Sequence, residues 1–234
     1  MLTPLDRKNS SFVTQAAGAA ATWNLPPVWE GKAKGESEGS TANAGYRLPA
    51  VWEGREKGSA AGNPIAASGA PVWRLDRLFP GDAIMAANYA PMIWDGTRWA
   101  APDHTQAGHP SAQIADGKVS VAAMGPWTGD LNFAKIPVLA FIAPKSGTYQ
   151  VSGTANAKPW EGGAAAYPLS LLKKDTQRAA EISVVQLPRD GTPVPFSAKI
   201  ELAAGDEILF VPMTQDLHNN AANLMIEDLV ITPQ

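Results

Sequence analysis

The sequence predicts an all-β protein built as an antiparallel β-sandwich, and two observations support this. First, 21 glycines and 20 prolines among 234 residues are typical of many short strands joined by turns. Second, from about residue 72 apolar segments alternate with turn signals roughly every 8–12 residues, the spacing of a sandwich or barrel. No segment has a convincing amphipathic pattern for a helix longer than a turn or two. The strands can therefore be assigned in order along the chain.

The strands are clearest in the second half of the sequence. Residues 138–143 form a continuous apolar run of buried-strand length, and residues 148–153 alternate polar and apolar side chains after a Pro-Lys-Ser-Gly turn. Four further strands are expected at residues 167–172, 181–187, 196–202 and 207–211, with a tight Ala-Gly-Asp turn between the last two.

The last strand is expected to contain an irregularity. Leu224 and Ile226 share one parity, whereas Leu229 and Ile231 share the other. Because successive side chains of a strand point to opposite faces, all four can be buried only if an extra residue intervenes. The sequence therefore predicts a β-bulge at Glu227-Asp228.

The first 71 residues are expected to form an extended arm, and residues 72–234 the sandwich. Residues 10–70 are rich in Ala, Gly, Ser and Asn, which cannot form a core of normal density alone. They contain a repeat: residues 25–35 (LPPVWEGKAKG) and residues 48–58 (LPAVWEGREKG) share eight of eleven positions at a period of 23, with a partial third copy at residues 70–73.

Each repeat is interpreted as a short edge strand that ends at Glu-Gly and must pack on something else. Three interpretations of its tryptophans remain open. They can attach the arm to the sandwich, bind a ligand, or pair with another chain, which would make the protein self-associate through the arm.

Composition excludes several functional classes. A net charge of −3 leaves no basic stripe for phosphates, so we expect neither nucleic acid nor an anionic membrane as a partner. The chain has no cysteine and three histidines, which excludes disulfides and thiolate chemistry and leaves little for acid-base catalysis. No apolar run approaches the roughly 18 residues of a membrane span. Residues 1–6 do not resemble a leader, so any export signal is absent from this sequence.

Three segments carry a resemblance to a known class of module. They are residues 139–153 (LAFIAPKSGTYQVSG), residues 202–210 (LAAGDEILF) and residues 223–232 (NLMIEDLVIT). Together with residues 89–99 (YAPMIWDGTRW), they resemble the non-catalytic jelly-roll modules of secreted bacterial carbohydrate-active enzymes, which are similar to carbohydrate-binding modules. The resemblance covers roughly residues 73–232. It implies a jelly-roll sandwich, a polysaccharide or glycan as partner, and a secreted, extracellular location.

Tryptophans in predicted loops are the candidate ligand-binding residues. Sugar rings present apolar C–H faces that stack on flat indole rings, while carboxylates and amides bind the hydroxyl groups. Trp94, Trp99, Trp127 and Trp160 all lie beside turn residues or at strand ends. The preferred pair is Trp127 and Trp160, flanked by the hydrogen-bond acceptors Asp130 and Glu161. The alternative for each tryptophan is burial in the sandwich.

A structural calcium ion is the one cofactor expected. The resemblance implies that carboxylates of the first and last strands hold such an ion, and Glu227 and Asp228 offer hard oxygen ligands at the expected bulge. The alternative is a charged bulge at a sheet edge. His104 and His109, five residues apart, are assigned to a polar surface loop rather than to a metal site.

The sequence therefore predicts non-catalytic, extracellular glycan binding. No nucleophile elbow, phosphate loop or metalloprotease helix is present, and the scattered carboxylates indicate no catalytic pair. Two alternatives remain: a structural protein of an extracellular or viral assembly, and an accessory domain of a polysaccharide lyase or hydrolase.

Overall fold

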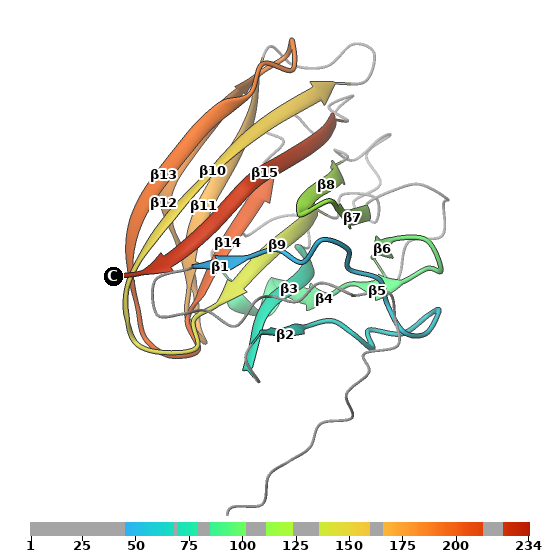
Figure 1. Cartoon of the computed structure of the whole chain (residues 1–234), viewed down its shortest axis with the longest axis horizontal. Coiled ribbons are helices and arrows are strands. Elements are labelled where there is room, and N and C mark those ends of the chain that lie inside the picture. Colours follow the sequence, from blue (N-terminus) through green and yellow to red (C-terminus); the bar gives the residue numbers. More distant parts are fainter. Residues whose placement is uncertain are drawn as a thin grey trace, which may run out of the picture.

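The described part of the protein consists of two packed antiparallel β-sheets (Figure 1). The computed structural model describes residues 45–67, 70–78, 85–101, 111–123, 136–159, 166–212 and 222–234. Within these residues the helical structure is limited to one 3-10 turn, η1 (Ala86–Asn88). The all-β class and the sandwich architecture are thus confirmed. No helix among the described residues has the length and apolar character needed to span a membrane.

The first sheet is organised around the last strand of the chain. Its order is β13 (Val194–Leu202), β10 (Gly147–Pro159), β15 (Ala222–Pro233), β8 (Lys118–Ala123), β7 (Ser111–Ala115), β6 (Trp99–Ala100) and β5 (Ile93–Trp94). Strand β15 pairs along one side with β10. On its other side β8 pairs with its first half and β1 (Tyr46–Arg47) pairs with Val230 and Ile231.

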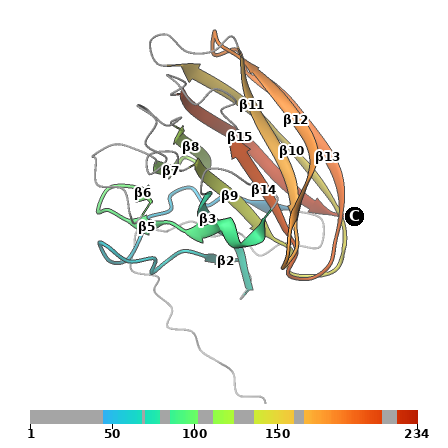
Figure 2. The ribbon, with the colours of Figure 1, turned by 180° about the vertical axis from the view of Figure 1, so that it is seen from behind.

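The second sheet has the order β12 (Ala179–Pro188), β11 (Ala166–Lys174), β14 (Glu207–Pro212), β9 (Ile136–Ile142), β3 (Ala70–Leu78) and β2 (Ile65–Ala67). The short strand β4 (Tyr89–Pro91) pairs with the end of β3. Figure 2 shows β2 and β3 side by side. The strands expected from the apolar runs thus correspond to β9 to β14, in the expected order.

The main core lies between the sheets and is centred on aromatic rings. Phe141 of β9 is fully buried, and its ring contacts those of Tyr46, Trp73 and Tyr149 at centroid distances of 5.2, 5.3 and 5.6 Å. These four side chains come from β1, β3, β9 and β10. The aromatic contacts therefore join both sheets to a strand of the predicted arm.

The bulge expected in the last strand is confirmed. Ser152 pairs with Val230 and Thr154 pairs with Glu227, so two residues of β15 face the single Gly153 of β10. Asp228 occupies the extra position with φ of 52°. A side chain at Gly153 would place its Cβ 2.8 Å from the ring of Phe196, so glycine allows the strands to meet here.

The described part of the predicted arm packs into the sandwich. Leu48 and Trp52 are 7% and 1% exposed, and the indole of Trp52 donates a 2.8 Å hydrogen bond to the carbonyl of Gly62. For this copy of the repeat, the interpretation that the tryptophan attaches the arm to the sandwich is confirmed. Trp29, in the first copy, lies outside the described residues, and the domain division at residue 72 stays a prediction.

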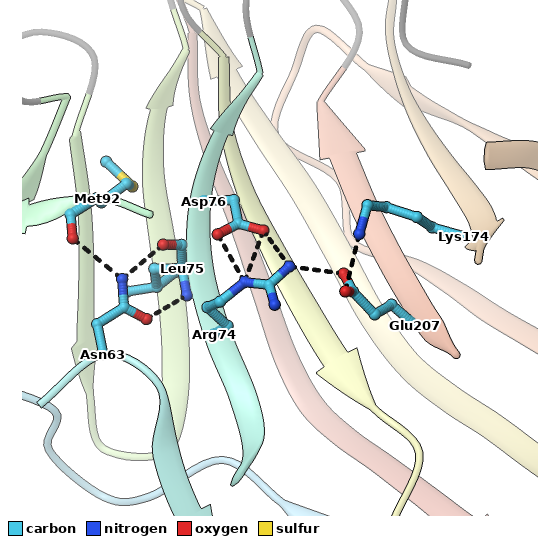
Figure 3. Close-up of polar contacts among 7 residues, drawn as sticks. All are labelled: Asn63, Arg74, Leu75, Asp76, Met92, Lys174 and Glu207. Atoms are coloured by element: carbon cyan, nitrogen blue, oxygen red, sulfur yellow. Dashed lines mark hydrogen bonds and ion pairs between the residues drawn. The ribbon is translucent and has the colours of Figure 1, made fainter. Parts of the chain in front are cut away.

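One buried amide connects the arm to β3 (Figure 3). The side chain of Asn63 donates to the carbonyls of Leu75 and Met92, at 2.6 and 3.1 Å, and accepts from the backbone N–H of Leu75 at 2.9 Å. Asn63 is 6% exposed. Its amide pairs with the buried N–H of Leu75 and the carbonyl of Met92, and it is a second donor to the carbonyl of Leu75, which also accepts from the N–H of Met92 at 2.9 Å.

We predict that Asn63→Ala lowers the free energy of unfolding by about 2–4 kcal/mol, because the buried N–H of Leu75 and the carbonyl of Met92 lose their partner, while the carbonyl of Leu75 keeps the N–H of Met92. Urea denaturation of both proteins measures the difference. Asn63→Asp, which keeps the acceptor but not the donor, should also be destabilising. A loss below about 0.5 kcal/mol for Asn63→Ala would show that the amide is not structurally required.

Candidate functional site

The four described tryptophans fall into two groups. Trp52, Trp73 and Trp99 are at most 1% exposed, and their indole N–H groups donate to the carbonyls of Gly62, Arg47 and Trp52 at 2.8–3.0 Å. Trp94 is only partly buried. Its indole N–H makes no hydrogen bond within the described residues, although its backbone pairs with Ser59 and Gly58. Of the four described tryptophans, Trp94 is therefore the one best placed to contact a ligand.

Trp94 rests on a stack of buried rings. The centroid of Trp94 lies 5.5 Å from that of Trp99 at an interplanar angle of 64°, and Trp99 lies 5.9 Å from Trp52 at 63°. Such edge-to-face contacts are stabilising beyond the burial of apolar area. Gly54 also approaches so closely that a Cβ there would overlap Cβ and Cγ of Trp94. These contacts hold the indole in one orientation.

Polar groups border Trp94 at the β5–β6 turn. Asp95 accepts hydrogen bonds through one carboxylate oxygen from the backbone N–H groups of Thr97 and Arg98, at 2.8 and 2.9 Å. Its other oxygen accepts from Nε of Arg98 at 3.1 Å. Gly96 takes φ of 105° at the tip, and the side chain of Lys57 lies against it. The Nη groups of Arg98 make no hydrogen bond to the part of the chain that the structure describes.

The charge of Asp95 is stabilised by this turn. Burial alone would raise the pKa of its carboxyl, but the hydrogen bonds from Thr97 and Arg98 outweigh burial and hold the pKa below its ordinary value. The carboxylate is therefore ionised at neutral pH. Its negative charge orients Arg98 beside Trp94.

The site combines a flat apolar ring, an indole N–H and a guanidinium group within one short hairpin. An indole face attracts C–H groups, whereas the N–H and the Nη donors suit oxygen acceptors such as hydroxyl groups. The described residues of this hairpin offer groups that suit the binding of a ligand.

The predicted ligand-binding residues have different outcomes. Trp94 and Trp99 are brought together, but Trp99 is fully buried and supports Trp94 instead of facing solvent, which corrects its expected role. The position of Trp99 at a predicted strand end did not show that the rings of Trp52 and Trp94 pack against it. The remaining predicted residues, Trp127, Asp130, Trp160 and Glu161, lie outside the described residues and stay predictions.

Sequence reasoning did not identify Arg98 and Lys57 as neighbours of Trp94. Arg98 precedes Trp99 in the sequence, so the hairpin could have suggested it. Lys57 comes from the second repeat, and only the docking of that repeat brings it to the hairpin.

A second polar cluster, which the sequence did not predict, lies on the outer face of the seven-stranded sheet (Figure 3). Arg74 contacts Asp76 and Glu207 at 2.7 Å each, and Lys174 contacts Glu207 at 2.8 Å. Burial raises the pKa of Asp76, while Arg74 acts in the opposite direction. The four charges sum to zero and pair with one another, so the cluster joins β3, β14 and β11 and leaves no group to recruit a ligand.

The expected calcium ligands are near a lysine. Glu227 accepts from Nζ of Lys118 at 2.8 Å and contacts the amide of Asn156 at 3.5 Å, and Asp228 is exposed at the bulge. Calcium takes six to eight oxygen ligands, and the described residues contain no group of three or more acidic or histidine side chains placed for a metal. Glu227 and Asp228 would supply only part of such a ligand set, and the expectation of calcium stays a prediction.

We predict that Asp95→Asn destabilises the protein more at pH 7 than at pH 3. The pKa of Asp95 is lower in the folded state than in the unfolded state, so its stabilisation is present above the ordinary carboxyl pKa of about 3.9 and is lost as the pH falls through the folded-state value. Chemical denaturation of both proteins at the two pH values measures this. An equal difference at both would contradict the assignment.

Comparisons with known proteins give no family. No protein-family model matches the sequence, and no curated protein matches it. Solved structures similar to this chain include the N-terminal cellulose-binding domain from Cellulomonas fimi β-1,4-glucanase C, with 12% identity, a TM-score of 0.37, and coverage of 54% of this chain and 84% of that one. Another is the CBM22-1 xylan-binding domain from Paenibacillus barcinonensis, with 12% identity, a TM-score of 0.34, and coverage of 56% and 77%.

A third similar structure is the enzymatically active domain of a bacteriophage CBA120 tailspike protein, with 9% identity, a TM-score of 0.33, and coverage of 69% of this chain and 19% of that one. At these TM-scores none of the likenesses carries an argument about function. The structural neighbours thus include carbohydrate-binding modules, the class that the sequence resembles, and the sandwich assignment rests on the two sheets themselves.

Proposed function

We propose that this protein binds glycans outside the cell, without catalysis, and that Trp94 is the stacking platform. The observation that supports this most directly is that Trp94, alone among the described tryptophans, is partly exposed and has an indole N–H without a partner in the described chain. Its three counterparts are buried and hydrogen-bonded. Because its contacts with Trp99 and Gly54 already fix the ring of Trp94, the ring loses little conformational entropy when a ligand stacks on it.

The polar surroundings of Trp94 favour a neutral, hydroxyl-rich ligand. Asp95 and Arg98 neutralise each other, so the hairpin offers hydrogen-bond donors without a strong net charge. A sugar ring can place its C–H face on the indole and its hydroxyl oxygens near the Nη groups of Arg98. A strongly anionic ligand would gain little from a pair that is already neutral, and the chain as a whole carries a charge of −3.

The loop residues predicted from the sequence would extend this site or form a second one. Trp127 with Asp130, and Trp160 with Glu161, retain the pattern of an aromatic ring beside an acceptor. A structural calcium ion at Glu227 and Asp228 remains part of the proposal as a stabilising cofactor, as does the secreted location.

A structural role in an extracellular assembly is the second candidate function. One observation favours it: the second repeat lies in a docked segment, in which Tyr46 and Arg47 pair with β15 just before the repeat and Trp52 of the repeat is buried in the core. A segment with the same residues could occupy that position in an assembly.

The test of glycan binding is Trp94→Ala, assayed on a glycan microarray and then by titration with the glycans found. Loss of the stacked ring should cost about 1–3 kcal/mol, which weakens binding roughly 5- to 150-fold. Trp127→Ala and Trp160→Ala, assayed in parallel, test the pair that the sequence predicts.

Val184→Ala is the matched control, because this side chain is 40% exposed on β12, away from the hairpin. The melting temperature of every variant separates loss of binding from loss of folding. Binding that is unchanged in a folded Trp94→Ala protein would remove Trp94 from the site. Absence of binding by the unmodified protein to any glycan on the array would favour the assembly function.

A further inference from the structure

The surface that holds the second repeat can be defined contact by contact. The backbone of Tyr46 pairs with Ile231 and its ring packs on Phe141. Val51 forms an antiparallel bridge with Ala115. The carbonyl of Trp52 accepts from the indole of Trp99, and Gly58 donates to the carbonyl of Trp94 at 2.7 Å. We call this set of partners, namely Ile231, Phe141, Ala115, Trp99 and Trp94, the docking surface.

Residues 23–35, which are the first repeat and the two residues before it, match residues 46–58 at every position that faces the docking surface except one, where Trp23 replaces Tyr46. Leu48, Pro49 and Trp52 are buried, and their equivalents 23 residues earlier are identical. The partly buried positions are also kept, with Val28, Glu30 and Gly31 equivalent to Val51, Glu53 and Gly54 and with Trp23 replacing Tyr46 as the aromatic residue.

Apart from Gly45 and Tyr46, the positions that differ between the two segments face solvent. Arg47, Ala50, Arg55 and Glu56 are exposed, and Asn24, Pro27, Lys32 and Ala33 replace them in the first repeat. Proline in place of Ala50 removes only a backbone N–H, whereas the contact made there uses the carbonyl of Ala50, which accepts from Gly117 at 3.2 Å. Nothing that the docking surface recognises is therefore lost.

One residue explains why the second repeat holds the surface. Gly45 precedes it with φ of 72°, and a Cβ there would lie 2.8 Å from Cγ1 of Val230. The equivalent residue before the first repeat is Thr22, which is strained in that conformation. Docking of the first repeat would also lengthen the connection to Asn63 by 23 residues, a cost that grows only slowly with loop length.

We propose that the docking surface also accepts the first repeat of the same chain, residues 23–35, so that the arm packs on the sandwich in two alternative registers. The second repeat dominates because Gly45 fits against β15. Weakening the second repeat transfers the surface to the first, and Trp29 then occupies the place of Trp52.

Disulfide trapping in the full chain tests this directly, because the sequence contains no cysteine and each introduced pair has no competitor. Directly opposed residues of antiparallel strands have Cα atoms about 4.5–5.5 Å apart, within the range that a disulfide spans. Val51→Cys with Ala115→Cys reports the second register and is the positive control. Val28→Cys with Ala115→Cys reports the first.

The reporter for the first register is placed in two backgrounds that weaken the second repeat. Trp52→Ala removes the buried ring of the second repeat. Gly45→Thr places before the second repeat the same residue that precedes the first, Thr22, without changing the core. Adding Trp29→Ala to each background gives a matched control that removes the anchor of the first repeat. If Trp52→Ala fails to fold, Gly45→Thr still provides the test.

We expect the reporter for the first register to form an intramolecular disulfide in either background, at a yield that falls about tenfold when Trp29→Ala is added. Peptide mapping and denaturing electrophoresis identify the bond. Free thiols in both folded backgrounds, while the positive control oxidises, would overturn the proposal. Disulfide-linked dimers in place of monomers would also overturn it, because the first repeat would then dock on a second copy of the chain.

Discussion

The ring of Trp99 lies between those of Trp52 and Trp94, and the arm and the candidate site both depend on it. On one side Trp99 packs edge-on against Trp52 and donates its indole N–H to the carbonyl of that residue. On the other side it supports the partly exposed Trp94. Because one buried ring serves both contacts, the packing of the second repeat and the orientation of the proposed binding platform are physically coupled.

Buried polar groups add hydrogen bonds and ion pairs to the apolar packing at two places. Asn63 hydrogen-bonds the backbone at two places and thereby fixes the segment that follows the second repeat. On the outer face, Arg74 reaches across β9 to Glu207; in β9, Ala140 is the residue opposite Arg74 and Ile142 the residue opposite Glu207. In both places the polar groups are buried and need their partners. Removing one partner would cost more free energy of unfolding than the hydrogen bond or ion pair contributes, because the other group would stay buried and unpaired.

Much of the sandwich could be predicted from local patterns. The apolar run that became β9 and the parity change at Glu227-Asp228 are local signals, and both were confirmed. The role of Gly54 was not predictable, since its contact partner Trp94 is 40 residues away in the sequence. Burial of Trp99 was missed for the same reason: it depends on a distant segment, residues 45–67, that composition alone assigned to an arm.

The candidate site shows the same division between local and distant information. Trp94 beside Asp95 and Gly96 could be identified as a tryptophan in a turn, and this position is the one proposed to bind. The features that distinguish it from Trp99 are its partial exposure and an indole N–H without a partner in the described chain. These follow from tertiary packing, which the neighbouring residues in the sequence do not encode.

Among the described tryptophans, Trp94 alone has an indole N–H that makes no hydrogen bond to the described chain and can donate to a ligand. Proton NMR of the indole N–H groups, with assignments from single Trp→Phe variants, tests it through exchange with water. We expect the N–H of Trp94 to exchange rapidly and its resonance to shift when a bound oligosaccharide is added, while those of Trp73 and Trp99 exchange slowly and do not move. If the N–H of Trp94 is as protected as that of Trp99 and does not respond to any glycan, Trp94 is not the binding platform.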